Sequence, residues 1–252
     1  MALEGEINGV VPDYIIFSDT GWEPQNIYDW TEKVNKYIKE KYNREIIYTN
    51  GGNIRTDLIR AATEGTRVAS LPFFTLDEDG KKGMVMRQCT GNYKINPVKR
   101  KVRDLLGYKP GQRVKEVVHM WKGISTDEIQ RVKPIADKWI EAEHPLVEIV
   151  NVDRSACIAY VERTGLGTPA KSSCIGCPFH DDQTWLELKR NDPKSFEDAC
   201  YVDDLIRTMP KLKSKCFLHK SCKPLREVDL NEDQISFFDD DFTNECEGFC
   251  GI

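Results

Sequence analysis

Residues 13–21, DYIIFSDTG, combine a short apolar run with a cluster of turn residues. Such a run, closed by turn residues, is typical of a buried strand. In the stretch that follows, Ile27, Trp30, Val34 and Ile38 recur at helical spacing, which predicts an amphipathic helix. The segment therefore predicts a strand that leads directly into a helix.

The same alternation of strand and helix recurs along the chain. A second strand is expected over residues 44–50 and a helix over 53–64, and a third strand over 115–125. A further helix is expected over 153–165, with Gly165 as its stop. This order predicts an α/β fold with a mostly parallel, twisted sheet covered by helices on both faces. Such sheets bind ligands at the carboxyl ends of their strands.

The length and composition set limits on the class of protein. With 252 residues, we expect a nucleotide-binding-like α/β domain over residues 1–165. A cysteine-containing helical or irregular segment, residues 166–252, would pack on it. No apolar run approaches the ~18 residues that a membrane helix needs, and the N-terminus lacks the basic start and apolar run of a secretory signal. The chain is therefore expected to be soluble and cytoplasmic, with no membrane partner.

The charges are unevenly distributed along a chain whose formal net charge is −5. Residues 94–115 hold eight Lys or Arg and one acid, whereas residues 227–247 hold nine acids and no base. The acidic balance argues against a general nucleic-acid coat. We expect a small anionic ligand or a nucleic-acid end to bind near the basic segment, rather than an extended duplex.

The stretch KSSCIGCPFH, residues 171–180, contains a Cys-x-x-Cys pair, Cys174 and Cys177. Nine cysteines, an odd number, in a chain without an export signal do not suggest a disulfide framework. The pair is compatible with a redox dithiol, half of a zinc site or part of an iron–sulfur cluster. Pro178 favours a turn over the helix start of a thioredoxin-like site.

The remaining cysteines divide into candidate ligands and candidate core residues. Cys89, Cys246 and Cys250 could complete a four-thiolate site. Cys157 lies in the middle of an expected helix and is interpreted as a core residue, as is Cys200. Cys216 and Cys222 have no obvious partner. His180 and His219 are open to two interpretations, metal ligands or residues with local hydrogen bonds.

Four segments in order, FSDTGWEPQNIY, RQCTGNYKINPVKRKVRDL, HMWKGISTDEIQRVK and KSSCIGCPFH, resemble the phosphoadenylylsulfate (PAPS) reductase family, within the adenine-nucleotide α-hydrolase-like superfamily. The similarity extends to bacterial and phage members of unassigned substrate, which end in a similar Asn-Glu-Cys-Glu-Gly-x-Cys-Gly tail. It covers most of the chain.

The resemblance implies both a nucleotide site and a metal site. Ser18, Asp19, Thr20 and Gly21 would lie beside the nucleotide, and Cys89, Cys174 and Cys177 would ligate a [4Fe–4S] cluster. Family members that bear a cluster have two adjacent cysteines at the first position, where this chain has Gln88-Cys89. The fourth ligand would then be Cys246 or Cys250, or one iron would stay open, as in the tRNA-thiolating relatives. Alternatively, the tail is simply frayed.

A second departure concerns the phosphate site. Relatives that use ATP or PAPS begin with a strand and a Ser-Gly-Gly-x-Asp-Ser-like loop, whose amides cradle phosphates. No such loop precedes Asp13, so it either lies upstream of Met1 or has been lost. The resemblance places four cations around a nucleotide phosphate or a reduced sulfur species: Arg87, Lys94, Arg131 and Lys133.

The tail also departs from the reductases, which carry Glu-Cys-Gly-x-His. Here the histidine is absent and the neighbouring acids disfavour a thiolate. The first hypothesis is an iron–sulfur enzyme that reduces a sulfonucleotide or drives sulfur transfer with ATP. Adenosine phosphosulfate, a nucleic acid, and a reductase or sulfur-donor protein are its candidate substrates and partners. The second is a non-catalytic binding module, and the third a structural zinc site.

Overall fold

Six elements lie where the sequence pattern predicts them. In the computed structural model, which describes residues 1–67 and 71–230, strand β1 spans Ile15–Asp19 and helix α1 spans Gln25–Tyr42. Strand β2 (Ile46–Asn50) and helix α2 (Ile54–Glu64) follow. Strand β5 is Val118–Trp121 and helix α5 is Arg154–Arg163. These predictions are confirmed.

Most of the other elements were not predicted from the sequence. The strands are β3 (Phe74–Leu76), β4 (Lys82–Met84), β6 (Ile140–Glu143) and β7 (Lys215–Phe217). The helices are α3 (Asn96–Leu105), α4 (Pro145–Glu148), α6 (Asp182–Asn191) and α7 (Pro193–Ile206). Short 3-10 turns span Ala2–Glu4, Thr126–Arg131 and Leu225–Glu227, and a π-helical turn spans Thr90–Ile95.

The strands form three small sheets, and the expectation of one continuous parallel sheet is wrong for the described residues. β1 pairs with β2 and β5 pairs with β6, both in parallel, while β3 pairs with β4 and β7 in antiparallel fashion. The fold is therefore mixed α/β with small parallel sheets. The two parallel pairs do not join in the described residues, and a cavity lies between β1 and β5.

Capping residues set the ends of the helices that flank the first sheet. α1 ends at Asn43, whose left-handed backbone (φ 52°) closes the helix. The side chain of Asn53 accepts a hydrogen bond from the amide of Thr56 and so caps α2 at its start. Gly65, with φ 65°, ends α2. The glycines and asparagines around β2 thus fix where each element begins and ends.

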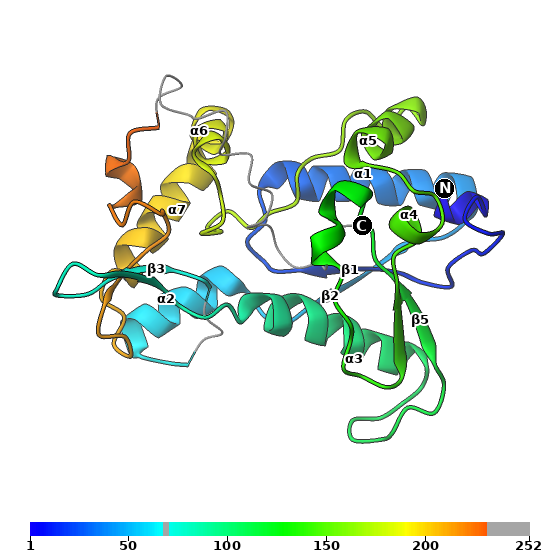
Figure 1. The fold of residues 1–252 in the computed structure, drawn as a ribbon, viewed down its shortest axis with the longest axis horizontal. Helices are drawn as coiled ribbons and strands as arrows, with labels where there is room; N and C mark the ends of the chain where they lie inside the picture. The colour runs from blue at the N-terminus through cyan, green and yellow to red at the C-terminus, as the bar shows by residue number, and fades with distance from the viewer. Residues whose placement is uncertain (68–70, 231–252) are drawn as a thin grey trace.

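The main hydrophobic core joins the N-terminal half of the chain to helices that come much later. α2 packs against α7, and α6 packs against α7. Figure 1 shows α2, α6 and α7 together on one side of the molecule and β5 on the other. Leu58, Trp185 and Val202 are completely buried in this core. Burying such side chains contributes about 1.5–3 kcal/mol each.

Two cysteines that the sequence assigned to the core have different environments. Cys200 is 1% exposed within the main core, as predicted. Cys157 is only half-buried, because none of the residues of α5 is fully buried, so its assignment to the core is wrong.

Within the described residues, no helix is both long enough and apolar enough to cross a membrane.

Candidate functional site

The loop after β1 is joined to the start of α2. The amide of Ile54 donates to the carbonyl of Thr20 at 2.9 Å, and the Asn53 side chain donates to the carbonyl of Gly21 at 2.8 Å. Gly21 has φ 72°, and a Cβ there would lie 2.5 Å from the Asn53 amide nitrogen. This position therefore requires glycine. The Thr-Gly pair is held in one place by the neighbouring helix.

The other two predicted residues, Ser18 and Asp19, lie at the end of β1 and form hydrogen bonds of their own. The Asp19 carboxylate accepts from the amide of Gly21 at 2.7 Å and from the Tyr28 hydroxyl at 3.0 Å. Burial, together with the charge of Asp19, raises the pKa of Tyr28. The Ser18 hydroxyl donates to the carbonyl of Tyr93 at 2.8 Å. Asp19 thus shapes the loop, and Ser18 ties it to the segment that follows Cys89.

The Cys-x-x-Cys loop packs directly against the loop after β1. The amide of Ile175 donates to the carbonyl of Trp22 at 2.8 Å. Gly176 lies flat against the Trp22 ring, since a Cβ there would come within 2.1 Å of a ring carbon. The Trp22 indole nitrogen donates to Asp198 at 2.7 Å, which fixes the ring. The sequence analysis missed Trp22 and Gly176, although a glycine inside Cys-x-x-Cys was a signal of close approach.

Cys174 belongs to a buried polar cluster. Its sulfur lies 3.2 Å from the Thr20 hydroxyl and its thiol donates to a carboxylate oxygen of Glu23 at 3.5 Å. The Thr20 hydroxyl donates to the same oxygen at 2.8 Å. Burial, reinforced by the charge of Glu23, raises the pKa of the Cys174 thiol well above its usual value, and Lys94 opposes this. Positive charge brought next to Cys174 would favour its thiolate.

Most of the predicted ligands and cations line one small cavity of about 70 Å³. Its lining includes three cysteines and three of the predicted cations: Cys89, Cys174, Cys177, Arg87, Lys94 and Arg131. They come from segments that lie far apart in the sequence, as Arg87 and Cys177 show. Lys133 is exposed and does not line this cavity. Cys89 directly precedes the π-helical turn, an irregularity often found at functional sites.

The three cysteines of the small cavity do not form a site for a single ion in the described residues. A mononuclear zinc site holds its thiolates ~2.3 Å from the metal, and therefore close to one another. Among the described residues, the three cysteines do not form a group whose ligand atoms all lie within 4.8 Å of one another. The predicted Cys246 and Cys250 lie outside the described residues, so a fourth ligand is not assigned.

The two predicted histidine candidates have local hydrogen bonds. His180 contacts Ser173 at 3.1 Å and packs edge-on against Trp185. Burial lowers the pKa of His180 to about 3, which keeps its ring neutral. His219 contacts Ser221 at 2.8 Å and Asp182 at 3.2 Å. The contacts of His219 support hydrogen bonding as its role. His180 lines the small cavity with the three cysteines, and its buried Nδ1 has no hydrogen-bond partner among the described residues, so its contacts fit a metal ligand as well as a hydrogen-bonding residue.

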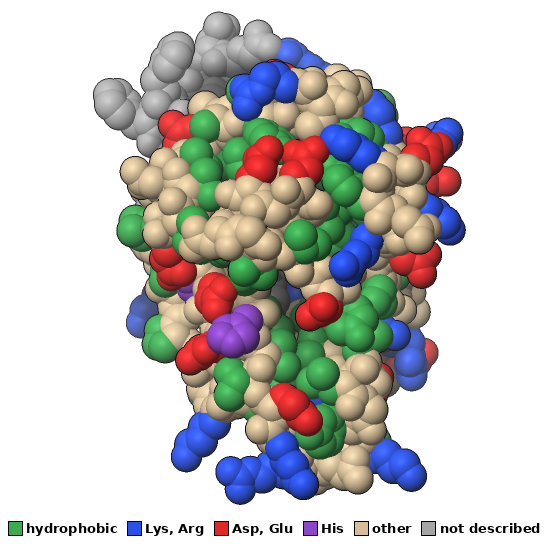
Figure 2. All heavy atoms as spheres, turned by 90° about the vertical axis from the view of Figure 1, so that its right-hand side faces the viewer, with side chains coloured by type: hydrophobic (Ala, Val, Ile, Leu, Met, Phe, Trp, Pro, Cys, Tyr) green, Lys and Arg blue, Asp and Glu red, His purple; other side chains and the backbone are tan. Residues whose placement is uncertain are grey.

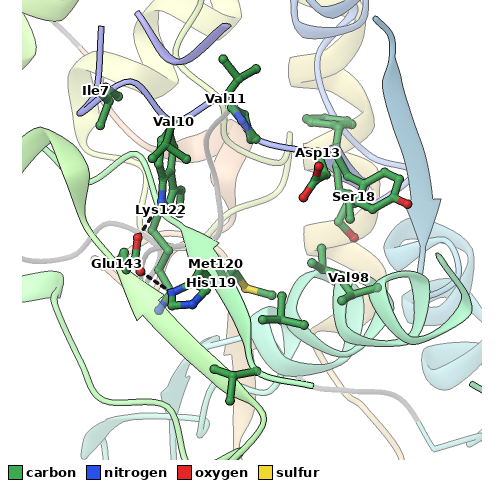
Figure 3. A pocket seen from close by; sticks show the side chains of 18 of the residues that line it. Ile7, Val10, Val11, Asp13, Ser18, Val98, His119, Met120, Lys122 and Glu143 are labelled. Atoms are coloured by element: carbon green, nitrogen blue, oxygen red, sulfur yellow. Dashed lines mark hydrogen bonds and ion pairs between the residues drawn. The ribbon is translucent and has the colours of Figure 1, made fainter. Parts of the chain in front are cut away.

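A second, larger cavity of about 690 Å³ lies between β1 and β5. Figure 3 shows side chains of both parts of the fold around it, including Ser18, Val98, Met120 and Lys122. Lys94 and Ser172 line both cavities. The two cavities are therefore neighbours.

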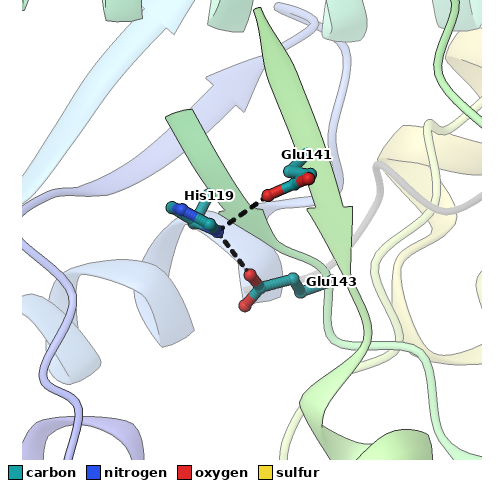
Figure 4. A group of neighbouring side chains, drawn as sticks. All are labelled: His119, Glu141 and Glu143. Atoms are coloured by element: carbon teal, nitrogen blue, oxygen red, sulfur yellow. Dashed lines mark hydrogen bonds and ion pairs between the residues drawn. The ribbon is translucent and has the colours of Figure 1, made fainter. Parts of the chain in front are cut away.

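Beside the large cavity, His119, Glu141 and Glu143 gather on β5 and β6 (Figure 4). The His119 ring lies 2.6 Å from one oxygen of Glu143, and the Trp121 indole donates to the other at 2.7 Å. The side chains of His119 and Glu141 are 59% and 67% exposed. Both oxygens of Glu143 are thus engaged, and the group is explained by hydrogen bonds between neighbouring strands. The sequence analysis missed it because β6 was not predicted.

Compared with known proteins, the chain matches no family model, no curated protein and no solved structure. A functional proposal therefore rests on the residues of the site and their chemistry.

Proposed function

We propose that the protein is an iron–sulfur protein similar to PAPS reductases, which acts on a nucleotide-activated substrate by sulfonucleotide reduction or ATP-dependent sulfur transfer. The observation that carries the proposal is the small cavity lined jointly by Cys89, Cys174 and Cys177 and by Arg87, Lys94 and Arg131. Thiolates select soft metals and iron–sulfur clusters. Guanidinium and ammonium groups bind phosphate and sulfate.

In this proposal the cysteines hold the cluster and the cations hold the anionic substrate. When bound, the cluster would supply redox chemistry or an iron site for sulfur. Lys94 is 6% exposed and lines both cavities, so its ammonium can attract an anion in either of them. Arg87 stacks on the Phe179 ring, 5.3 Å from its centroid, which keeps the guanidinium beside the Cys-x-x-Cys loop.

Metal analysis after anaerobic purification tests the proposal. We expect iron and acid-labile sulfide in nearly equal amounts in the wild type, and loss of both in Cys89→Ala, Cys174→Ala and Cys177→Ala. Cys157→Ala is the matched control, because Cys157 is half-buried and does not line the small cavity. Zinc in place of iron, or iron that survives the three substitutions, would refute the cluster. Cys246→Ala and Cys250→Ala then test the tail as the source of a fourth ligand.

A non-catalytic binding module, which would keep the fold and a structural metal site, is the alternative. Equilibrium binding of ATP and of adenosine phosphosulfate, followed by assays of ATP hydrolysis and sulfite release, separates the two. An enzyme would turn over one of these nucleotides, and Lys94→Ala would weaken its binding. A protein that keeps its iron but neither binds nor converts a nucleotide would be a module with a structural metal site.

A further inference from the structure

His180 is the third member of a regular series in the Cys-x-x-Cys loop, in which Cys174, Cys177 and His180 occupy every third position. The amide of Cys177 donates to the carbonyl of Cys174, and the amide of His180 donates to the carbonyl of Cys177, each at 3.1 Å. Bonds of this spacing form a 3-10 helix, in which side chains three residues apart lie above one another. All three residues line the small cavity.

The helix that follows holds His180 in place. Asp181, the next residue, accepts a hydrogen bond from the amide of Thr184 at 2.6 Å and so caps α6 at its start. The His180 ring packs edge-on against Trp185 of this helix, with the ring centroids 4.6 Å apart. Trp185 is completely buried in the main core. The core therefore fixes the position and the tilt of the imidazole.

The two ring nitrogens of His180 have different surroundings. Nε2 lies 3.1 Å from the Ser173 hydroxyl, whereas Nδ1 is buried and has no hydrogen-bond partner in the described part of the chain. A buried polar atom without a partner is destabilising, and such atoms are rare in native proteins. A metal-ligating histidine binds the metal with one ring nitrogen and donates the other N–H to a nearby group. His180 matches this arrangement, with Ser173 at Nε2 and Nδ1 left to ligate.

The other three histidines do not combine these features. Both ring nitrogens of His219 have hydrogen-bond partners. His144 is buried and its Nε2 has no partner among the described residues, but it does not line the small cavity. The side chain of His119 is 59% exposed, and Figure 2 shows an exposed histidine beside acidic side chains on the face that carries β5. Within the described ranges, the combination of an unpartnered ring nitrogen and a cysteine-lined cavity therefore belongs to His180.

We propose that His180 is the fourth ligand of the metal centre and binds it through Nδ1, together with Cys89, Cys174 and Cys177. This inference rests on the iron–sulfur centre of the proposed function. Among the described residues, no fourth cysteine lines the small cavity, so the fourth position is open to a donor other than sulfur. An imidazole nitrogen is a suitable ligand for iron.

A histidine ligand changes the charge of the centre. A neutral imidazole in place of a thiolate leaves the centre with one negative charge fewer than four cysteines would give it. Histidine in place of cysteine raises the reduction potential of iron–sulfur centres. Arg87, Lys94 and Arg131 line the same cavity and would attract the anionic substrate, which a less negative centre repels less. His180 therefore suits a centre that lies beside an anion.

Pulsed EPR spectroscopy of the dithionite-reduced full chain, labelled with [15N]histidine, tests the proposal. Iron and acid-labile sulfide are measured first on the same sample, and this measurement reports on the proposed function alone. We expect the wild type to show the 15N coupling of one directly bound histidine nitrogen. The coupling should disappear in His180→Asn. It should persist in His144→Asn, the matched control, because His144 also has a buried ring nitrogen without a partner among the described residues but lies outside the small cavity.

Two further variants keep the test informative if His180→Asn does not fold. His180→Cys supplies a thiolate at the same position, so it should retain the wild-type amounts of iron and sulfide. It should also abolish the histidine coupling and lower the reduction potential. The double variant Cys246→Ala and Cys250→Ala should retain both the iron and the coupling.

The outcomes separate this inference from the proposed function. Wild-type protein without iron and sulfide would refute the proposed function and, with it, a cluster ligand at His180. Iron-loaded wild-type protein without a bound histidine nitrogen, or a coupling that survives in His180→Asn or His180→Cys, would overturn only the role of His180. A coupling that is lost in His144→Asn, or a reduction potential that does not fall in His180→Cys, would overturn it as well.

Discussion

The two cavities of this protein lie side by side but are built in opposite ways. The small cavity is walled by sulfur and cations, and its loops are fixed by backbone bonds such as Ile175 to Trp22. The large cavity is walled by exposed apolar side chains and an open strand edge. A site held this tightly is suited to chemistry that needs fixed geometry.

The largest expected effect comes from filling the contact between Gly176 and Trp22. Gly176→Ala would place a methyl group 2.1 Å from a ring carbon, and overpacking of this kind costs about 1–3 kcal/mol. Gly91→Ala is the matched control, since a Cβ at Gly91 meets nothing within 4 Å, and alanine in a helical turn should stabilise slightly. Urea unfolding measures both. Equal stability of the two variants would show that the small cavity is not rigid.

The next effect concerns the buried cluster around Cys174. Thr20→Val removes the hydroxyl that donates to Glu23, and an unsatisfied buried acceptor costs about 1–3 kcal/mol. Thr31→Val is the control: Thr31 is equally buried, but its hydroxyl bonds only to the helix carbonyl of Ile27. We expect the first substitution to lower the free energy of unfolding by clearly more than the second. If Thr31→Val were instead the more destabilising substitution, the Thr20 hydroxyl and the Glu23 carboxylate would not be needed to hold Cys174 in place.

A smaller, pH-dependent effect is expected at Asp182, just after the Cys-x-x-Cys loop. The hydrogen bond from His219, assisted by Lys220, lowers the pKa of Asp182 below its usual 3.8. Because the pKa is lower in the folded state, the stabilisation is present above pH 3.8 and is lost as the pH falls through the folded value.

Asp182→Asn should therefore lower the free energy of unfolding at pH 7 by less than about 1 kcal/mol, as befits a partly exposed pair. It should also reduce the loss of stability on acidification below pH 3.8. Denaturant midpoints at pH 7 and pH 3 measure both effects, with the exposed Glu187→Gln as control. An unchanged acid response would show that His219 does not stabilise the Asp182 carboxylate.

The smallest effect is expected in the large cavity. Val117 is 55% exposed, so Val117→Thr should change stability by no more than about 0.5 kcal/mol. Thermal unfolding checks this. Ile124→Thr is the contrast, because Ile124 is 2% exposed and its substitution should lower the stability several times more. A large loss of stability at Val117 would mean that this wall of the cavity is part of the core and not an exposed surface.

Much of the local structure could be predicted from the sequence because it depends on neighbours along the chain. The apolar spacing of β1 and α1, the Asn53 cap and the Gly65 stop are all local signals. β3, β4 and β7 have only three residues each, which is too short for a clear period-2 pattern. Cys157 was misassigned because the pattern shows which residues are apolar, but not which face of α5 is covered.

The candidate site divides in the same way, into residues that the sequence identified and residues that only the tertiary structure revealed. Cys89, Cys174, Cys177, Arg87, Lys94 and Arg131 were chosen from the sequence and its resemblance, and they line one cavity. Lys133 was chosen by the same reasoning but lies on the surface outside it. Trp22, Gly176 and Glu23 were not chosen, because only the close approach of the two loops gives them a role.

The sequence by itself determined the six regular elements that its periodicity predicts and the caps that end them. It also determined which cysteines can ligate a metal and which cations can bind an anion. Only the tertiary structure decided that β1 and β5 stay apart, that Trp22 closes over Gly176 and that Lys94 is shared by both cavities. The physical reason is the distance along the sequence over which each interaction acts. Helix caps and hydrophobic periodicity depend on residues a few positions apart, whereas the continuity of a sheet and the walls of a cavity depend on packing between distant segments.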